Sequence, residues 1–166
     1  MGPRQGSVSI DRTTGEALVE YARAVIEAAV GDDSPPDPPD ISILEENRGV
    51  FVTLNIHGEL RGCIGRPMPQ QPLGEGLRAA ATGAATADPR FPPLDPAELQ
   101  NVTISVSVLT PPSELSPPDP DAIDVGRDGL IVSKGHRTGL LLPQVALEQG
   151  WTADAFLRGT ARKAGL

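Results

Sequence analysis

Several segments of the chain alternate apolar and polar residues, or form short apolar runs between turn residues, as β-strands do. The clearest alternation lies between residues 102 and 109, where valine and isoleucine occupy every second position and serine and threonine the positions between. This pattern predicts a strand with one buried face. The predicted strands are 50–56, 60–65, 102–109, 130–133 and 139–142.

Other segments repeat their apolar residues at helical spacing. Residues 13–30 predict an amphipathic helix, with Thr13 and Glu16 in a capping-box pattern and Gly31 placed to end it. An acidic, proline-rich connection follows at 32–40. The remaining helical predictions are an Ala-rich helix over 73–87, a brief turn from Asp95-Pro96 to Leu99, and C-terminal helices over 143–148 and 152–163, the last with Thr152 as its N-cap.

These elements predict an α+β fold with mainly antiparallel pairing. The order strand, turn, strand, helix occurs twice, at 50–87 and at 129–163, which suggests an internal duplication at the level of pattern. The length of 166 residues fits one compact domain or two closely packed lobes. The 18 glycines and 18 prolines exclude a coiled coil or a long helical bundle.

Composition excludes several functional classes. The net charge is −8 and no run of lysine or arginine occurs, so we expect no nucleic-acid partner. Cys63 is the only cysteine, which rules out an intrachain disulfide, and the two histidines are too few for a structural zinc site. No apolar stretch is long enough for a membrane span, and no signal peptide is recognised. We therefore expect a soluble cytoplasmic protein with no membrane partner, no metal and no cofactor.

The segment from Leu60 to Gly65 carries the chemical interest, and its register is partly open. A two-residue turn would place Arg61 and Cys63 on the apolar face of strand 50–56. A three-residue loop or a bulge would instead place Leu60 and Ile64 there. Hydrophobic consistency favours the second arrangement, which puts Arg61 and Cys63 on the opposite face with Thr53 and Asn55.

In that arrangement Arg61 and Cys63 are about 7 Å apart on one pleated face. A fixed cation favours the thiolate, and the flanking Gly62 and Gly65 leave the sulfur approachable by a ligand. These features suggest a reactive thiol in a small cleft. The alternative is that Cys63 is a small buried hydrophobe, the usual role of a free cysteine.

Weaker candidates lie elsewhere in the chain. Asp88 and Arg90 flank Pro89 in a rigid loop, where such a pair is either a local clamp or a binding group. His57 and His136 occupy predicted hairpin turns, and nothing in the sequence brings either to the thiol. Trp151 is expected to be a packing anchor between the last two helices.

Four ordered segments resemble the AMMECR domain family, named for the Alport-syndrome, midface-hypoplasia and elliptocytosis chromosomal region. They are Leu60–Gly65, Asp88–Leu94, Ile104–Leu109, and Leu142–Ala146 with Glu148–Trp151, and the similarity extends from about Ala17 to Leu166. The resemblance implies two unequal lobes in a single domain over 1–166. It also implies a cytoplasmic prokaryotic setting with Memo-like and radical SAM proteins as partners. The family has no firmly established activity.

The resemblance makes Arg61 and Cys63 the candidate functional pair and places Asp88 and Arg90 in a second family motif. The chain departs from the family pattern at Ala161, where many members have a cysteine, so the resemblance does not extend to a mechanism that needs two thiols. It also stops at Leu166, before a further segment that family chains usually carry. This leaves a naturally short protein or an edge exposed for a partner as alternatives.

Two functions follow. The first is a small enzyme or accessory protein in which Cys63 is a nucleophile or acceptor and Arg61 its activator and anion clamp. Asn55 and Asp88 would orient a small anionic substrate, with Arg90 and the two motif glycines also at the binding site. The second is a non-catalytic binding or adaptor module that uses the same hairpin as a rigid interaction surface.

Overall fold

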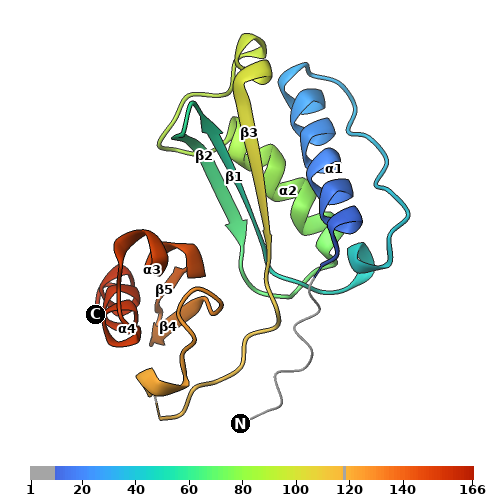
Figure 1. Cartoon of the computed structure of the whole chain (residues 1–166). Coiled ribbons are helices and arrows are strands. Elements are labelled where there is room, and N and C mark those ends of the chain that lie inside the picture. The colour runs from blue at the N-terminus through green and yellow to red at the C-terminus, as the bar shows by residue number, and fades with distance from the viewer. Residues whose placement is uncertain (1–9, 118) are drawn as a thin grey trace. The chain divides into compact units, whose positions relative to one another are not determined.

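The alternating segments form strands and the helically spaced segments form helices, which confirms the α+β class with antiparallel pairing. The computed structural model describes residues 10–117 and 119–166. The chain forms two compact units, Met1–Ser113 and Glu114–Leu166 (Figure 1). None of the helices in the described residues has the length and apolar character needed to cross a membrane.

The first unit is built on a three-stranded antiparallel sheet with the order β2-β1-β3. Its strands are β1 (Val50–Ile56), β2 (Glu59–Arg66) and β3 (Val102–Val108). As predicted from the alternation, Val50, Val52 and Leu54 of β1 are buried on one face. The hydroxyl-bearing residues of β3 fall on the other face, so the sheet has an apolar side and a polar side.

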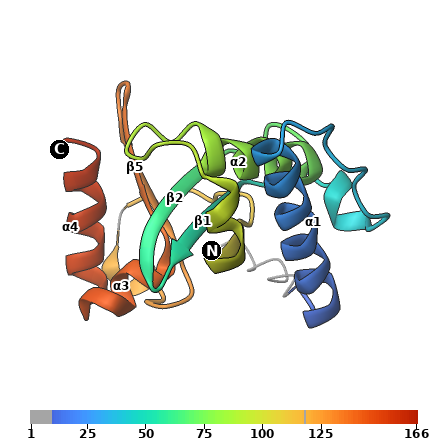
Figure 2. The ribbon, with the colours of Figure 1, turned by 90° about the horizontal axis from the view of Figure 1, so that it is seen from above.

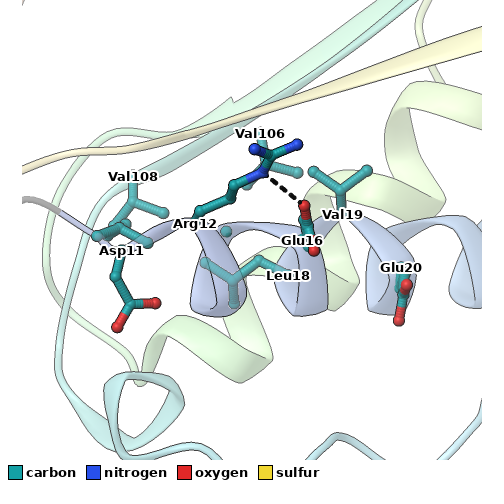
Figure 3. Close-up of a pocket in the computed structure, with 10 residues that line it drawn as sticks. Asp11, Arg12, Glu16, Leu18, Val19, Glu20, Val106 and Val108 are labelled. Carbon is teal, nitrogen blue, oxygen red and sulfur yellow. Dashed lines mark hydrogen bonds and ion pairs between the residues drawn. The ribbon is translucent and has the colours of Figure 1, made fainter.

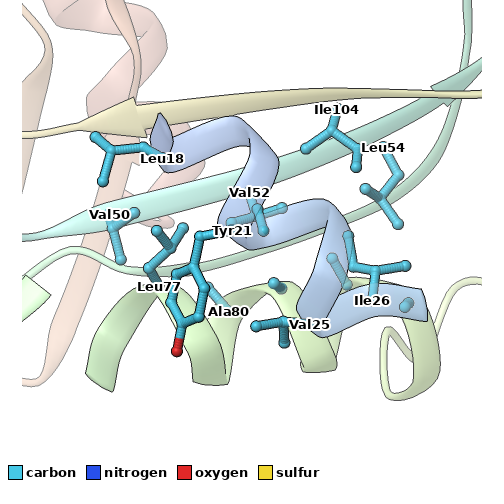
Figure 4. Close-up of a cluster of buried hydrophobic side chains, with 14 of the residues drawn as sticks. Leu18, Tyr21, Val25, Ile26, Val50, Val52, Leu54, Leu77, Ala80 and Ile104 are labelled. Carbon is cyan, nitrogen blue, oxygen red and sulfur yellow. The ribbon is translucent and has the colours of Figure 1, made fainter. Parts of the chain in front are cut away.

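Two helices, α1 (Arg12–Val30) and α2 (Leu73–Thr86), cover the apolar side. They pack against each other as well as against the sheet (Figure 1). Figure 4 shows the resulting core, in which Leu18, Tyr21 and Ile26 of α1 meet strand residues such as Val52 and Leu54. Because this core fixes one face of the sheet, the polar face is left to present side chains.

The start of α1 differs from the prediction. Asp11, rather than Thr13, is the N-cap, and its carboxylate accepts a hydrogen bond of 2.7 Å from the backbone N–H of Thr14. The predicted capping box at Thr13 and Glu16 is therefore wrong, because an aspartate two residues earlier satisfies the same helix end. Gly31 ends the helix as expected.

The β1–β2 hairpin combines features of both predicted registers. Its turn has two residues, His57 and Gly58, both with positive φ, the geometry that matches the twist of a tight hairpin. A bulge then follows at Arg61, so that Asn55 faces Leu60 while Leu54 faces Gly62. The bulge was expected, but the placement of Leu60 on the apolar face is wrong. Its side chain is 42% exposed, because the bulge comes after it rather than before.

The second unit contains a two-stranded hairpin and two helices. The strands are β4 (Leu130–Lys134) and β5 (Arg137–Leu141), followed by α3 (Pro143–Gln149) and α4 (Ala153–Lys163). Helix α4 packs along the hairpin (Figure 2), around a small core that includes Phe156. Trp151 packs against this core as expected, and a side-chain carbon at Gly159 would lie 2.7 Å from its ring. The N-cap at Thr152 is confirmed.

Candidate functional site

Cys63 lies near the middle of β2, on the polar face of the sheet, directly opposite Thr53. Its backbone N–H donates to Asp88 rather than to β1, so Thr53 and Cys63 form a non-hydrogen-bonded pair of the ladder. Side chains approach most closely in such pairs, and the Cys63 Sγ lies 3.3 Å from the Thr53 Oγ1. The thiol is free and half-buried, with a hydroxyl as its immediate neighbour.

Asp88 follows α2 and is buried, with 4% of its surface exposed. Its carboxylate accepts hydrogen bonds from the Cys63 N–H at 2.9 Å and from the Arg90 backbone and guanidinium at 2.8 to 3.1 Å. The bonds from Arg90 hold the pKa of Asp88 well below its usual value, although burial acts in the opposite direction. The loop is thus a clamp that joins the end of α2 to the outer edge of β2.

Arg90 is the arginine that this clamp brings to Cys63. Its Nη2 donates to the Cys63 carbonyl oxygen at 3.4 Å, and its side chain is 55% exposed. Hydrogen bonds to Asp88 raise the pKa of Arg90, and the charge of Asp88 adds to this shift. The Phe91 ring centroid lies 5.5 Å from the Arg90 guanidinium carbon and 5.9 Å from that of Arg61. Both distances lie within the range of a cation–π interaction.

Arg61 is occupied by other contacts. Its Nε and Nη2 donate to the two carboxylate oxygens of Glu98 at 2.9 and 3.0 Å, and its Nη1 donates to the Pro92 carbonyl at 2.9 Å. The bidentate pair raises the pKa of Arg61 and lowers that of Glu98. Only 14% of the Arg61 side chain is exposed. The bulge removes Arg61 from the regular alternation, and its guanidinium is directed at Glu98 rather than at Cys63.

The two glycines of the motif have different environments. Gly62 faces α2, where an added side-chain carbon would lie 2.2 Å from the carbonyl oxygen of Ala84. Gly65 lies on the same face as Cys63, beneath the ring of its cross-strand neighbour Phe51. Of the two glycines expected beside the sulfur, only Gly65 therefore shares its face, whereas Gly62 allows the helix to approach the strand.

The other predicted residues fall on the polar face or away from it. Asn55 lies on the face of Cys63, two residues along β1 from Thr53, and is half-buried. His57 is exposed in the hairpin turn, and His136 lies in the turn of the second unit. Within the described residues, neither histidine is hydrogen-bonded to Cys63, and no cluster of three metal-ligating side chains is formed.

Several partners at this site were not anticipated from the sequence. Thr53 pairs with the thiol, Glu98 neutralises Arg61, and the Phe91 ring lies within cation–π distance of both arginines. The sequence indicated only a helix start at Asp95-Pro96, and the structure adds a capping box there between Asp95 and Glu98. The same Glu98 side chain also accepts from Arg61, a long-range contact with no local sequence signal.

The arrangement offers one thiol on an open sheet face, beside a hydroxyl and within the field of a half-exposed guanidinium. The thiol can attack a small electrophile, and the guanidinium can bind an anionic group of the same molecule. No base is positioned to take the thiol proton in the described part of the chain. The side chains that contact Cys63 are those of Thr53, Asp88 and Arg90.

The chain is similar to several known proteins along most of its length. A family model described as AMMECR1 matches residues 19–166. A protein of Methanothermobacter thermautotrophicus is 52% identical over 165 residues, covering 95% of this chain and 85% of the relative. A protein of Pyrococcus furiosus is 52% identical, covering 92% and 77%. The crystal structure of an uncharacterized protein from Pyrococcus horikoshii superposes with a TM-score of 0.85 at 48% identity, covering 92% and 80% of the two chains.

Proposed function

The chain belongs to the AMMECR1 family, and we propose that it is a small enzyme or accessory protein whose site is built around the Cys63 thiol. The site takes a small anionic molecule, with Arg90 as its cation. Thr53 and Asn55 line the same face of the sheet and orient the bound molecule. Memo-like and radical SAM proteins stay its predicted partners by family association alone.

One observation carries this proposal. The buried Asp88 carboxylate binds the Cys63 N–H and the Arg90 guanidinium at once, which holds the only thiol next to a half-exposed cation. Arg90 is thereby suited to the role that the sequence suggested for Arg61. The N–H groups of Arg61 donate to Glu98 and to the Pro92 carbonyl. Arg61 therefore positions the loop that contains Pro92 rather than the substrate.

The proposal is tested by alkylation of the native protein at pH 7 with the anion iodoacetate and with neutral iodoacetamide. A guanidinium near the thiol attracts the anionic reagent, so the ratio of the two rates should exceed that of the unfolded chain. We expect Arg90→Ala to lower the ratio about three- to tenfold, for an interaction of ~1 kcal/mol between charges. Arg90→Lys should retain part of it.

The matched control is Arg12→Ala, which removes an exposed arginine on α1 and should leave the ratio unchanged. Mass spectrometry of the single modified site reads both rates. If Cys63 resists both reagents until the protein unfolds, the thiol is a packing group and the proposal fails.

An adaptor function is the second candidate, and it is favoured by the rigidity of the hairpin. Arg61, Gly62 and the Cys63 backbone are all engaged by other parts of the first unit. A non-catalytic module would tolerate Cys63→Ser without loss of function, whereas an enzyme that uses the thiol would lose turnover. Bulky replacement of Gly62 does not separate the two, because that position faces α2 rather than a partner.

A further inference from the structure

On the outer edge of β2, the backbone groups of Cys63 are hydrogen-bonded to a loop, whereas those of Gly65 are open to a partner. The Cys63 N–H and carbonyl face away from β1 and are bound by Asp88 and Arg90. Backbone groups two residues apart in a strand point the same way, and the pairing is regular from Gly62 to Arg66. The N–H and carbonyl of Gly65 therefore also face outward. Neither has a hydrogen-bond partner among the described residues.

A groove of about 480 Å³ lies along this open stretch, between β2 and α2. Ala79, Gly83 and Ala87 line it from the helix, while Gly65 and Met68 line it from the strand side. Small side chains on the helix leave width beside the strand edge, which is what an added extended chain requires.

The charged side chain that lines this groove is positive. Arg66 is the only charged residue that lines it, is exposed, and takes part in none of the ion pairs of the described residues. The groove beside the β3 edge is different (Figure 3): Asp11, Glu16 and Glu20 line it, and its one arginine, Arg12, is paired with Glu16. The net charge of −8 opposes the binding of acidic ligands in general, so the local positive charge of Arg66 makes the β2 groove a better place for an acidic ligand than the other groove.

We infer that the β2 edge at Gly65 binds an extended acidic segment of a partner protein by strand addition. The Gly65 N–H and carbonyl pair with the backbone of the segment, one of its small apolar side chains enters the groove beside Gly83, and its carboxylate meets Arg66. The open edge is short because Asp88 and Arg90 close it at Cys63. The complex is therefore weak and reversible, as in signalling contacts of small area.

The test uses a labelled seven-residue peptide of alternating threonine and valine with one central glutamate, and a matched peptide with lysine in its place. We expect the glutamate peptide to bind the native protein at least threefold more tightly by fluorescence anisotropy. Arg66→Glu should reverse that order. Arg12→Glu, at the acidic groove, should leave it unchanged.

Two further measurements separate strand addition from surface attraction. Hydrogen exchange of the Gly65 amide should slow when the peptide binds, and methylation of the peptide backbone nitrogens should abolish binding. Ala79→Leu should weaken binding by filling the groove, whereas Ala28→Leu on α1 should not. Unchanged exchange at Gly65, or equal binding by the Arg66→Glu and Arg12→Glu variants, would overturn the inference. Cys63→Ser should bind the peptide normally, so this result is independent of the thiol proposal.

Discussion

At the scale of single residues, Asp88 carries a buried negative charge. This charge is stabilised by Arg90, whose side chain is itself half-exposed. Four hydrogen bonds satisfy the carboxylate, three of them from Arg90 and one from the backbone of Cys63. Removing the negative charge leaves Arg90 free to turn into solvent and the Cys63 N–H with a weaker acceptor. The residue thus links the position of the thiol to the protonation state of one carboxyl group.

We expect Asp88→Asn to lower the free energy of unfolding by about 2–4 kcal/mol at pH 7. Folding lowers the pKa of Asp88, so its stabilising effect is complete above the unfolded-state pKa of ~3.9 and is lost as the pH falls through the folded-state value. The difference between the native protein and the variant should therefore shrink below about pH 4.

Urea unfolding at several pH values measures this difference. Asp154→Asn is the control, because Asp154 forms an exposed i,i+4 pair with Arg158 and should change stability by less than ~0.5 kcal/mol. A stability gap between Asp88→Asn and the native protein that persists unchanged at pH 2–3 would contradict the assignment of the lowered pKa.

At the scale of elements, the contact between β2 and α2 depends on Gly62. Any side chain at this position would meet the carbonyl oxygen of Ala84. That oxygen belongs to the backbone of α2, which packs against β2 and cannot turn aside as a flexible side chain could. We expect Gly62→Ala to cost about 2 kcal/mol or more, because strand and helix must separate to admit one methyl group. The shift of the urea midpoint checks this.

Gly58→Ala is the matched variant in the same hairpin. Nothing lies within 4 Å of the added carbon, so its cost comes only from the positive φ of 81° and should be about 1 kcal/mol. A smaller loss for Gly62→Ala than for Gly58→Ala would show that the helix can move away without penalty.

The sequence predicted the elements more fully than their contacts. Alternation identified β3 and helical spacing identified α2, because both patterns are local and are set by which face is buried. A bulge in the hairpin was only one of two readings, and its position at Arg61 was not predicted, since a single residue outside the ladder leaves the apolar pattern almost unchanged.

The site was less predictable for a related reason. Cys63 and Asp88 were both singled out, but the bond between them joins residues 25 apart and has no periodic signature. The choice between Arg61 and Arg90 as the cation near the thiol depends on Glu98, which competes for Arg61 from the far end of a loop. Local patterns carry no information on such competition.

At the scale of the whole molecule, the two units have cores of very different size. The first core joins two helices and three strands, whereas the buried core of the second consists of Ile123, Leu130, Ala146 and Phe156. Buried apolar area is the main source of stability, so we expect Glu114–Leu166 to unfold at lower urea than the first unit.

Amide hydrogen exchange resolved by residue measures this order directly. Amides of β4 and β5 should exchange through an opening of lower free energy than those of β1. Phe156→Leu should widen the gap, because it removes volume from the small core alone. A single exchange free energy for both units would show instead that they unfold together.

Trp151 packs in the second unit and Tyr21 in the first, and each is the only residue of its kind in the chain. Indole emission, excited at wavelengths that the phenol does not absorb, therefore reports on the second unit alone. A transition that leaves this emission unchanged can be assigned to the first unit. The protein thus carries a built-in optical label for one of its two units, and no dye or tag is needed.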